Sequence, residues 1–305
     1  MTSQLDVGRL SLLREVGLRG SIAAAARAVG LTASAVSQQL AVLERETATA
    51  LLERSPRGVA LTPAGRLLAD RAAEVLELLS AAAADLDRLA GSVAGRVQVA
   101  AVASAAVTFV SDAVAALRAS VPDVAVSVLA AEPDRGIGLL LTGDVDVAVV
   151  DEYDYVPLAL PEAALVHELC VDPLVLVRPA GRAGSRRGPV RLADVATADW
   201  VMPPEDAACG RAVRAACRAA GFEPRVRWES DDMLVLTRAV AAGHGVAVLP
   251  RRSVADPGGA DLGGVDVRPL TDPARARRLL AVARPGAAAR PPVAAVLDAL
   301  VAAAG

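Results

Sequence analysis

Residues 32–46 form the stretch whose side chains have the types and spacing to read nucleic-acid bases. Val36, Leu40 and Leu43 recur at i, i+4 and i+7, so a helix would place them on one buried face. The opposite face carries Ser34, Ser37, Gln38 and Gln39. Short hydroxyl and amide side chains can donate to and accept from base edges in the major groove. The pattern predicts a recognition helix.

An earlier helix and a tight turn would hold the recognition helix in place. Ser21 can cap the earlier helix and Thr32 the recognition helix, because each hydroxyl can accept a hydrogen bond from a free N–H of the first turn. Four alanines at residues 23–26 give the earlier helix little bulk, so the two helices can approach closely. Gly30 supplies a residue that tolerates positive φ between them. These features predict a helix-turn-helix.

Residues 51–62 predict a β-hairpin directly after this unit. They read LLERSPRGVALT, in which two apolar runs flank an Arg-Ser-Pro-Arg-Gly turn. Arginines at or near the tip can contact phosphate or enter a minor groove. A hairpin beside a recognition helix is a wing, which favours DNA binding over an arbitrary pair of helices. The residues expected to contact DNA are Thr32, Ser34, Ala35, Ser37, Gln38, Arg54 and Arg57.

A long helix is predicted to start at Thr62-Pro63, because Thr can cap it and Pro suits its first position. Apolar residues then recur with alternating spacings of four and three, at Leu68, Ala72, Val75, Leu79, Ala82, Leu86 and Leu89. So narrow a stripe on so long a helix needs a partner helix. We expect dimerisation through Leu68, Val75, Leu79, Leu86 and Leu89. The alternative is a core helix within one chain.

Beyond residue 95 the chain alternates apolar strands with helices, which is typical of an α/β domain. In the first half, strands are predicted at residues 97–102, 124–128 and 145–150, and their order implies a parallel sheet. In the second half, strands are predicted at residues 174–177, 200–202, 226–228 and 246–249. A last strand at residues 279–283 and a helix at residues 292–303 would return to the first half.

Open α/β sheets bind ligands beyond the carboxyl ends of their strands. The residues expected to bind a small molecule there are Ser104, Ala105, Glu132, Met202, Pro203, Asp231 and His244. Ser104 is also the predicted cap of a helix with Val107, Val110, Val114 and Leu117 facing inward.

No Arg stands at these strand ends, whereas acidic residues are frequent in the adjoining loops. We therefore expect a small polar ligand that carries an amine, with Ser104 at its acidic or hydroxyl end. The alternative is that the acids only solvate the loops.

The first 90 residues resemble the winged helix-turn-helix domain and linker helix of the LysR-type transcriptional regulators. The matching pieces are RGS at residues 19–21, AAAA at 23–26, SAVSQQLAVLE at 34–44, LLER at 51–54 and RGVALTPAGR at 57–66. Later in the chain, GFEPRVRWESDD at 221–232 and VAAGHGVAVLP at 240–250 are similar to the family's effector-sensing domain. The chain departs from the family at Thr47-Ala48, usually Leu-Gly, and at Leu52, usually Phe.

The resemblance implies a winged helix-turn-helix DNA-binding domain at residues 1–62 and a linker and dimerisation helix at residues 63–91. Residues 92–305 would form an α/β periplasmic-binding-protein-like effector-binding domain of two subdomains. Subdomain I would span about residues 95–168 and 268–305, and subdomain II about residues 169–267. A homodimer or homotetramer is expected, and its two-fold pairing predicts a pseudo-palindromic promoter site on double-stranded DNA. RNA polymerase is a further expected partner.

Composition and motif content exclude other classes. A net charge of −3 excludes a basic protein that coats nucleic acid without specificity. Affinity for DNA must therefore come from a specific geometry and from dimerisation. No signal peptide or membrane-spanning run is visible, which predicts a cytoplasmic protein without membrane contact. No hydrolase, zincin or nucleotide-binding motif occurs, so no catalytic residue, metal or cofactor is expected. Cys170, Cys209 and Cys217 lack metal-ligand spacing and should be reduced.

The sequence thus predicts a DNA-binding transcriptional regulator that responds to a small-molecule effector between two C-terminal subdomains, and not an enzyme. The competing class is a small-molecule binding protein or enzyme whose N-terminal module only oligomerises. A lesser alternative is a regulator switched by oxidation of Cys209 and Cys217, since a peroxide-sensing member of the family uses a disulfide in a comparable region.

Overall fold

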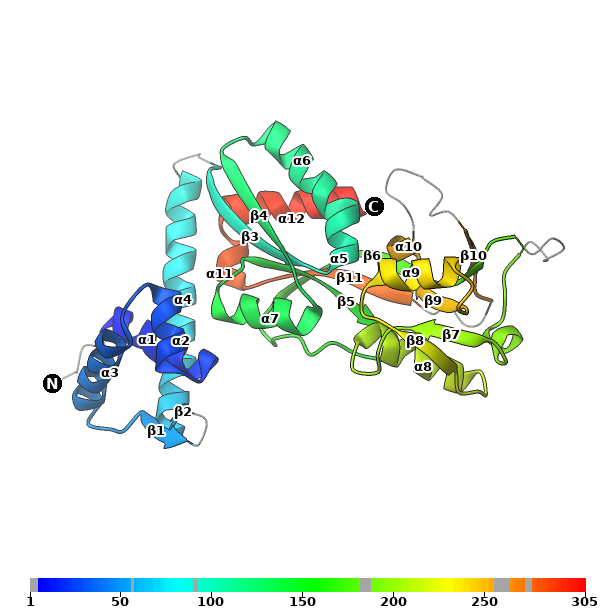
Figure 1. The fold of residues 1–305 in the computed structure, drawn as a ribbon. Coiled ribbons are helices and arrows are strands. Elements are labelled where there is room, and N and C mark those ends of the chain that lie inside the picture. Colours follow the sequence, from blue (N-terminus) through cyan, green and yellow to red (C-terminus); the bar gives the residue numbers. More distant parts are fainter. Residues whose placement is uncertain (1–4, 56–57, 90–92, 182–187, 255–263, 272–275) are drawn as a thin grey trace.

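The structure is a computed structural model that describes residues 5–55, 58–89, 93–181, 188–254, 264–271 and 276–305. The molecule is elongated (Figure 1). A small N-terminal domain lies at one end, a long helix stands beside it, and two α/β subdomains follow. Within the described residues, no helix is both long and apolar enough to cross a membrane.

The N-terminal domain is a winged helix-turn-helix. Its elements are α1 (Val7–Arg19), α2 (Ile22–Val29), α3 (Ala33–Thr47), β1 (Leu52–Ser55) and β2 (Gly58–Leu61). The predicted caps are confirmed, because Ser21 accepts a hydrogen bond from the N–H of Ala24 and Thr32 one from Ala35. Gly30 has the predicted positive φ, at 71°. Val36, Leu40 and Leu43 are buried in the core of this domain, as their spacing predicts.

The turn after α3 departs from the usual chemistry of a helix end. Ala48 has a φ of 48° and is the single non-glycine residue with positive φ among the described residues. An L-residue with a Cβ pays a steric cost in this left-handed conformation, which glycine avoids. Ala48 is the position at which the resembling family usually has glycine.

The long helix is α4 (Pro63–Leu89). The predicted cap is confirmed, because the Thr62 hydroxyl accepts a hydrogen bond from the Gly65 N–H at 3.0 Å. Its first turns belong to the N-terminal domain, where Ala69 and Ala72 are buried and Leu68 packs against the same core. Its later turns leave that core.

Subdomain I is built on a mixed sheet. Strands β3 (Gly95–Ala101), β4 (Val124–Ala130) and β5 (Val147–Tyr153) are parallel, as predicted. Strand β11 (Ala276–Ala283) runs antiparallel to β5, and β6 (Leu165–Pro179) runs antiparallel to β11.

Two layers of helices cover this sheet. On one face pack the helical segment 103–120, made of α5 (Ala103–Ala105), a π-helical turn (Ala106–Val110) and α6 (Ser111–Ser120), and α12 (Pro291–Ala304). The other face is covered by α7 (Pro133–Thr142). Strand residues alternate between the layers, so Val97 and Val99 face α6 and α12 whereas Ala100 and Ala148 face α7.

Subdomain II shares β6 with subdomain I. From Leu174 onward, β6 pairs with β9 (Ala247–Pro250) and β10 (Val265–Pro269), while its earlier part pairs with β11. Strands β7 (Asp199–Met202) and β8 (Arg225–Glu229) form a parallel pair. The helices of this subdomain are α8 (Ala208–Ala219), α9 (Met233–Ala241) and α10 (Arg251–Val254).

Three predictions about the α/β domain need correction. The strand predicted at residues 174–177 is present, but it is part of a 15-residue strand that crosses both subdomains, so the predicted bounds were too short. Ser104 does not cap a helix, since the residue at the helix start is Val102 and it makes no side-chain cap bond. Val107 is 62% exposed because the π-helical turn inserts an extra residue, which brings Phe109 to the buried face.

Candidate functional site

The polar face of α3 is open to solvent. Thr32, Ser34, Ser37 and Gln38 are exposed, and we call these four residues the reading face. Ala35 is half-buried. The neighbouring Gln39 is also exposed, but its amide oxygen accepts a hydrogen bond from Arg9 of α1 at 3.0 Å. Gln39 therefore braces α3 against α1, which leaves the reading face to contact a partner.

The hairpin lies where the sequence predicts a wing. Its register pairs Leu52 with Leu61 and Ser55 with Gly58. Arg54 is on β1, opposite Val59, while the predicted contact residue Arg57 lies outside the described residues. The arginine contacts with DNA stay predictions.

Glu44 couples the wing to α3, a role that the sequence analysis missed. Its Oε1 accepts hydrogen bonds from the N–H groups of Leu51 and Leu52, at 2.8 and 3.1 Å. These bonds fix the start of β1 to the end of the recognition helix. The signal was present, since an acid at a helix end before an apolar run can accept from its free N–H groups.

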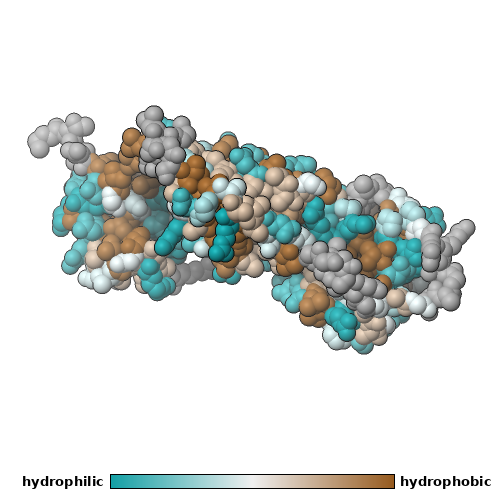
Figure 2. Space-filling view, turned by 90° about the horizontal axis from the view of Figure 1, so that it is seen from above, coloured by the Kyte–Doolittle hydropathy of each residue, from teal (hydrophilic) through white to brown (hydrophobic). Residues whose placement is uncertain are grey.

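The later half of α4 exposes an apolar face. Val75 is 38% exposed, Leu79 51% and Leu86 67%, and Leu78, absent from the predicted stripe, is 71% exposed. The side chain of Leu89 is not among those described. Leu68 packs within its own domain, so the exposed face starts beyond it. Figure 2 shows apolar side chains on the surface near the end of the molecule that holds the N-terminal domain.

Arg277 lies at the centre of the predicted effector cleft. It comes from the start of β11, and its Nη2 donates to the Ser104 hydroxyl at 2.8 Å. Its Nη1 donates to Asp151 at 2.8 Å, and its Nε and Nη2 donate to Asp172 at 3.0 and 2.8 Å. All three charged side chains are buried. Burial opposes the charge, but Tyr153, Asp151 and Asp172 outweigh it and raise the pKa of Arg277.

The expectation that no Arg stands at the cleft floor was therefore wrong. Arg277 is 173 residues from Ser104 in the chain, and its position before the apolar run at residues 279–283 gave no indication of that partner. Its charge is nevertheless balanced, because the two carboxylates of Asp151 and Asp172 face one guanidinium.

Glu132 adds a further carboxylate from subdomain I. Partial burial raises its pKa, and the nearby charges of Asp151 and Asp231 raise it further against the opposing charge of Arg277. The structure thus brings Ser104 and Glu132, two of the predicted ligand residues, near Arg277, and places Asp231, a third, near Glu132.

The other predicted ligand residues have buried or already engaged side chains, or different surroundings. Ala105 and Met202 are fully buried in the cores of subdomains I and II, and Pro203 uses its carbonyl to accept from Arg214 at 2.9 Å. His244 stacks on Trp228 with ring centroids 5.0 Å apart. It lies before β9, at the end of β7 opposite to Met202, and lines a polar groove with Arg178 and Asp266.

The cysteine thiols are poorly suited to a redox switch. Burial raises the pKa of both Cys209 and Cys217 to about 12, and a thiol reacts through its thiolate. Cys209 lies with Tyr153 of β5 in the buried core of subdomain II. All three cysteines are free. Among the described residues, no group of three or more His, Cys, Asp or Glu could hold a metal ion.

Two family descriptions match the chain. Residues 7–66 match the "Bacterial regulatory helix-turn-helix protein, lysR family", and residues 90–305 match the "LysR substrate binding domain".

Curated relatives span most of the chain. The transcriptional dual regulator GltC of Bacillus subtilis (strain 168) is 24% identical over 253 residues, covering 83% of each chain. The nitrogen assimilation regulatory protein nac of Klebsiella aerogenes is 28% identical over 250 residues, covering 81% of this chain and 78% of its own.

Solved structures share the fold. A variant of full-length OxyR from Pseudomonas aeruginosa superimposes with a TM-score of 0.73 at 20% identity, covering 99% of this chain and 95% of that one. Full-length CbnR complexed with its target DNA gives a TM-score of 0.56 at 21% identity, covering 99% and 100%. The winged domain, the long helix and the two-part α/β domain therefore form one known architecture.

Proposed function

The chain belongs to the LysR family of transcriptional regulators, and we propose that it reads its DNA site through the reading face of α3. The exposed hydroxyl and amide groups of that face carry the proposal, because they have room for base edges and Gln39 is already engaged. Arg54 and Arg57 of the wing would contact phosphate or the minor groove. Thr32 caps the start of the helix, and the half-buried Ala35 lies between the reading-face residues Ser34 and Ser37.

The assembly that presents two such domains would be a homodimer, or a tetramer made from two dimers. The exposed apolar face of α4, with Val75, Leu78, Leu79 and Leu86, supports helix pairing because water would otherwise cover it. Two-fold pairing would select a pseudo-palindromic site. A cytoplasmic location and contact with RNA polymerase belong to the same proposal.

A salt-dependent gel shift tests DNA binding directly. Purified protein should retard DNA from upstream of its own gene, with affinity that falls as salt rises, because phosphate contacts release counterions. A protein whose N-terminal module only oligomerised would give no retarded band at any salt concentration.

The effector would be a small polar molecule that carries an amine. Near Ser104 the cleft holds Glu132, Asp151, Asp172 and Asp231 against one guanidinium, that of Arg277. Because Asp151 and Asp172 already neutralise Arg277, an anionic ligand would gain little from it, whereas an amine would find acidic partners. The hydroxyl of Ser104 would meet an acidic or hydroxyl group at the other end of the ligand.

Thermal shift against a metabolite panel tests this class. Binding at about a hundredfold above Kd should add roughly 2.7 kcal/mol to the free energy of unfolding. Amines and amino acids should stabilise the protein, and Glu132→Gln should weaken that effect. Stabilisation by dicarboxylates with amines inert would contradict the proposed effector while leaving the DNA-binding proposal intact.

A further inference from the structure

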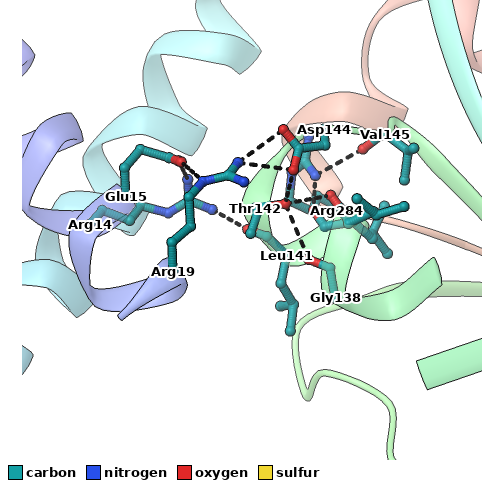
Figure 3. A network of polar contacts seen from close by, with 11 residues as sticks. Arg14, Glu15, Arg19, Gly138, Leu141, Thr142, Asp144, Val145 and Arg284 are labelled. Atoms are coloured by element: carbon teal, nitrogen blue, oxygen red, sulfur yellow. Dashed lines mark hydrogen bonds and ion pairs between the residues drawn. The ribbon is translucent and has the colours of Figure 1, made fainter. Parts of the chain in front are cut away.

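Helix α1 of the DNA-binding domain contacts the end of α7 in subdomain I (Figure 3). Arg19 donates from Nη2 to both carboxylate oxygens of Asp144, at 2.9 Å each. Arg14 donates from Nη2 to the carbonyl of Leu141. These bonds join residues 125 and 127 positions apart in the chain, so they connect two separately folded units.

Both sides of this contact are also held by hydrogen bonds and ion pairs within their own unit. Glu15, which is buried, accepts from the Nε of Arg19 at 2.8 Å and pairs with Arg14 at 3.4 Å. On the opposite side, the Thr142 hydroxyl donates to Asp144 at 2.7 Å. An isolated exposed ion pair contributes little, largely because two long side chains must be ordered. Here that ordering is supplied on both sides by the neighbouring bonds.

A third arginine reaches the same end of α7 from the opposite direction. Arg284 donates from Nη1 to the carbonyl of Leu140 and, at 3.2 Å, to that of Val145. Cations are favoured at a helix C-terminus, where unpaired carbonyls carry partial negative charge. Arg284 precedes α11 (Pro285–Ala288), which packs against α4. We call Arg14, Arg19 and Arg284 the arginine clasp.

The other end of α7 lies at the effector cleft. Glu132, whose carboxylate feels the charges of Asp151 and Arg277, immediately precedes the first residue of the helix. With ten residues it is about 15 Å long. At Gly136 it packs on the sheet, where an added Cβ would lie in ordinary contact with Ala100 and Ala148, at 3.7 and 3.8 Å. Ile137 and Leu140 of the helix lie in a buried core, and close-packed interiors transmit strain, so a displacement at one end of so short a helix would be felt at the other.

We propose that α7 and the arginine clasp transmit the state of the effector cleft to the DNA-binding domain. A ligand that displaces Glu132 would shift α7, and the clasp would carry that shift to α1. The recognition helix α3 lies on the far side of its domain from α7 (Figure 1), so the clasp orients the reading face and does not cover it. The proposed effect on DNA binding rests on the proposed function, whereas the contact between α1 and α7 does not.

Substitution of Asp144 tests the contact in the full-length protein. Asp144→Asn removes the charge that Arg19 contacts, and Asp144→Arg reverses it. Asp112→Asn is the matched control, because Asp112 is exposed in the first turn of α6 of the same subdomain, and α6 lies apart from α1 (Figure 1). Thermal unfolding of each variant checks that it is folded.

Small-angle scattering then measures the separation of the domains. Loss of one ion pair should raise the population of separated domains by up to about fivefold in Asp144→Asn, and charge reversal should raise it further. Salt should have the same effect on the unaltered protein. Scattering curves for Asp144→Arg that superimpose on those of the unaltered protein would overturn the clasp.

The DNA readout tests transmission. Binding to a single half-site should be unchanged in Asp144→Asn, since the reading face is intact, whereas discrimination between the natural half-site spacing and one altered by half a turn should fall. Unchanged discrimination, with domains shown to separate, would overturn transmission through the clasp. Absence of any retarded band with the unaltered protein would instead contradict the proposed function, so the two failures are distinguishable.

Discussion

The reading face and the effector cleft organise polar groups in opposite ways. Ser34, Ser37 and Gln38 are exposed on one helix, where solvent satisfies them until a partner arrives. Arg277, Asp151 and Asp172 are buried and satisfy one another. A surface of the first kind can be altered without loss of folding. A cluster of the second kind is part of the fold, so a change there affects stability before it affects binding.

The largest effect is expected in the cleft. Arg277→Met would leave two buried carboxylates without a cation and should lower the free energy of unfolding by about 3–5 kcal/mol. Arg278→Met, on the next residue, is the control, because Arg278 is half exposed and pairs with a partly buried carboxylate, that of Glu152. Its cost should stay below about 1 kcal/mol. Urea unfolding measures the free energy of unfolding of both variants. Equal losses in the two variants would contradict the distinction between the buried cluster and the exposed residue.

The exposed face of α4 should respond in assembly and not in folding. Leu79→Asp with Leu86→Asp would place two charges in the proposed helix pair, at a cost of several kcal/mol in association. The variant should sediment as a monomer and lose tight DNA binding, while its secondary structure is retained. A double variant that remains a dimer would place the dimer contact elsewhere.

The reading face should affect binding alone. Gln38→Ala should cost about 1–3 kcal/mol of DNA affinity and relax base preference, with unfolding unchanged. Arg57→Ala should weaken binding to all sequences alike and reduce the salt slope by about one. Fluorescence anisotropy over a set of single-base variants of the site separates the two, and unchanged specificity in Gln38→Ala would remove it from the reading face.

The smallest effect is expected at Ala48, in the turn between the recognition helix α3 and strand β1. Ala48→Gly should raise the free energy of unfolding by about 0.5–1 kcal/mol, because glycine relieves the positive φ that Ala48 adopts. DNA specificity should be unchanged. Thermal unfolding measures the gain, and a loss of stability would mean that unfolded-state entropy outweighs the strain.

The same contrast explains which features the sequence could predict. Caps, turns and the apolar face of α3 depend on residues within one or two helical turns, so Ser21, Gly30 and Thr32 were assigned correctly. The cleft depends on partners far apart in the chain. Arg277 meets Ser104 only because β11 returns beside β5, and no local pattern records that pairing.

The errors in the predicted helix and strand residues also have physical causes. Ideal helical periodicity predicted that Val107 is buried. The π-helical turn at Ala106–Val110 changes which side chains face the core, so Val107 is exposed instead. The length of β6 was underestimated because its first half, LVHELCVD, mixes charged with apolar residues at the sheet rim. The arginine clasp had no local signal, since its arginines come from α1 and from the residue before α11, two segments near opposite ends of the chain.

Footprinting over the upstream region of the gene tests the central claim most directly. With the unaltered protein, two protected half-sites related by a dyad should appear, separated by a whole number of helical turns of about 10 base pairs, in the range of salt at which gel shifts are seen. An amine effector should change the protection between them. Absence of any protected region at low salt, with a folded dimer in solution, would contradict the assignment of α3 as the DNA-reading element.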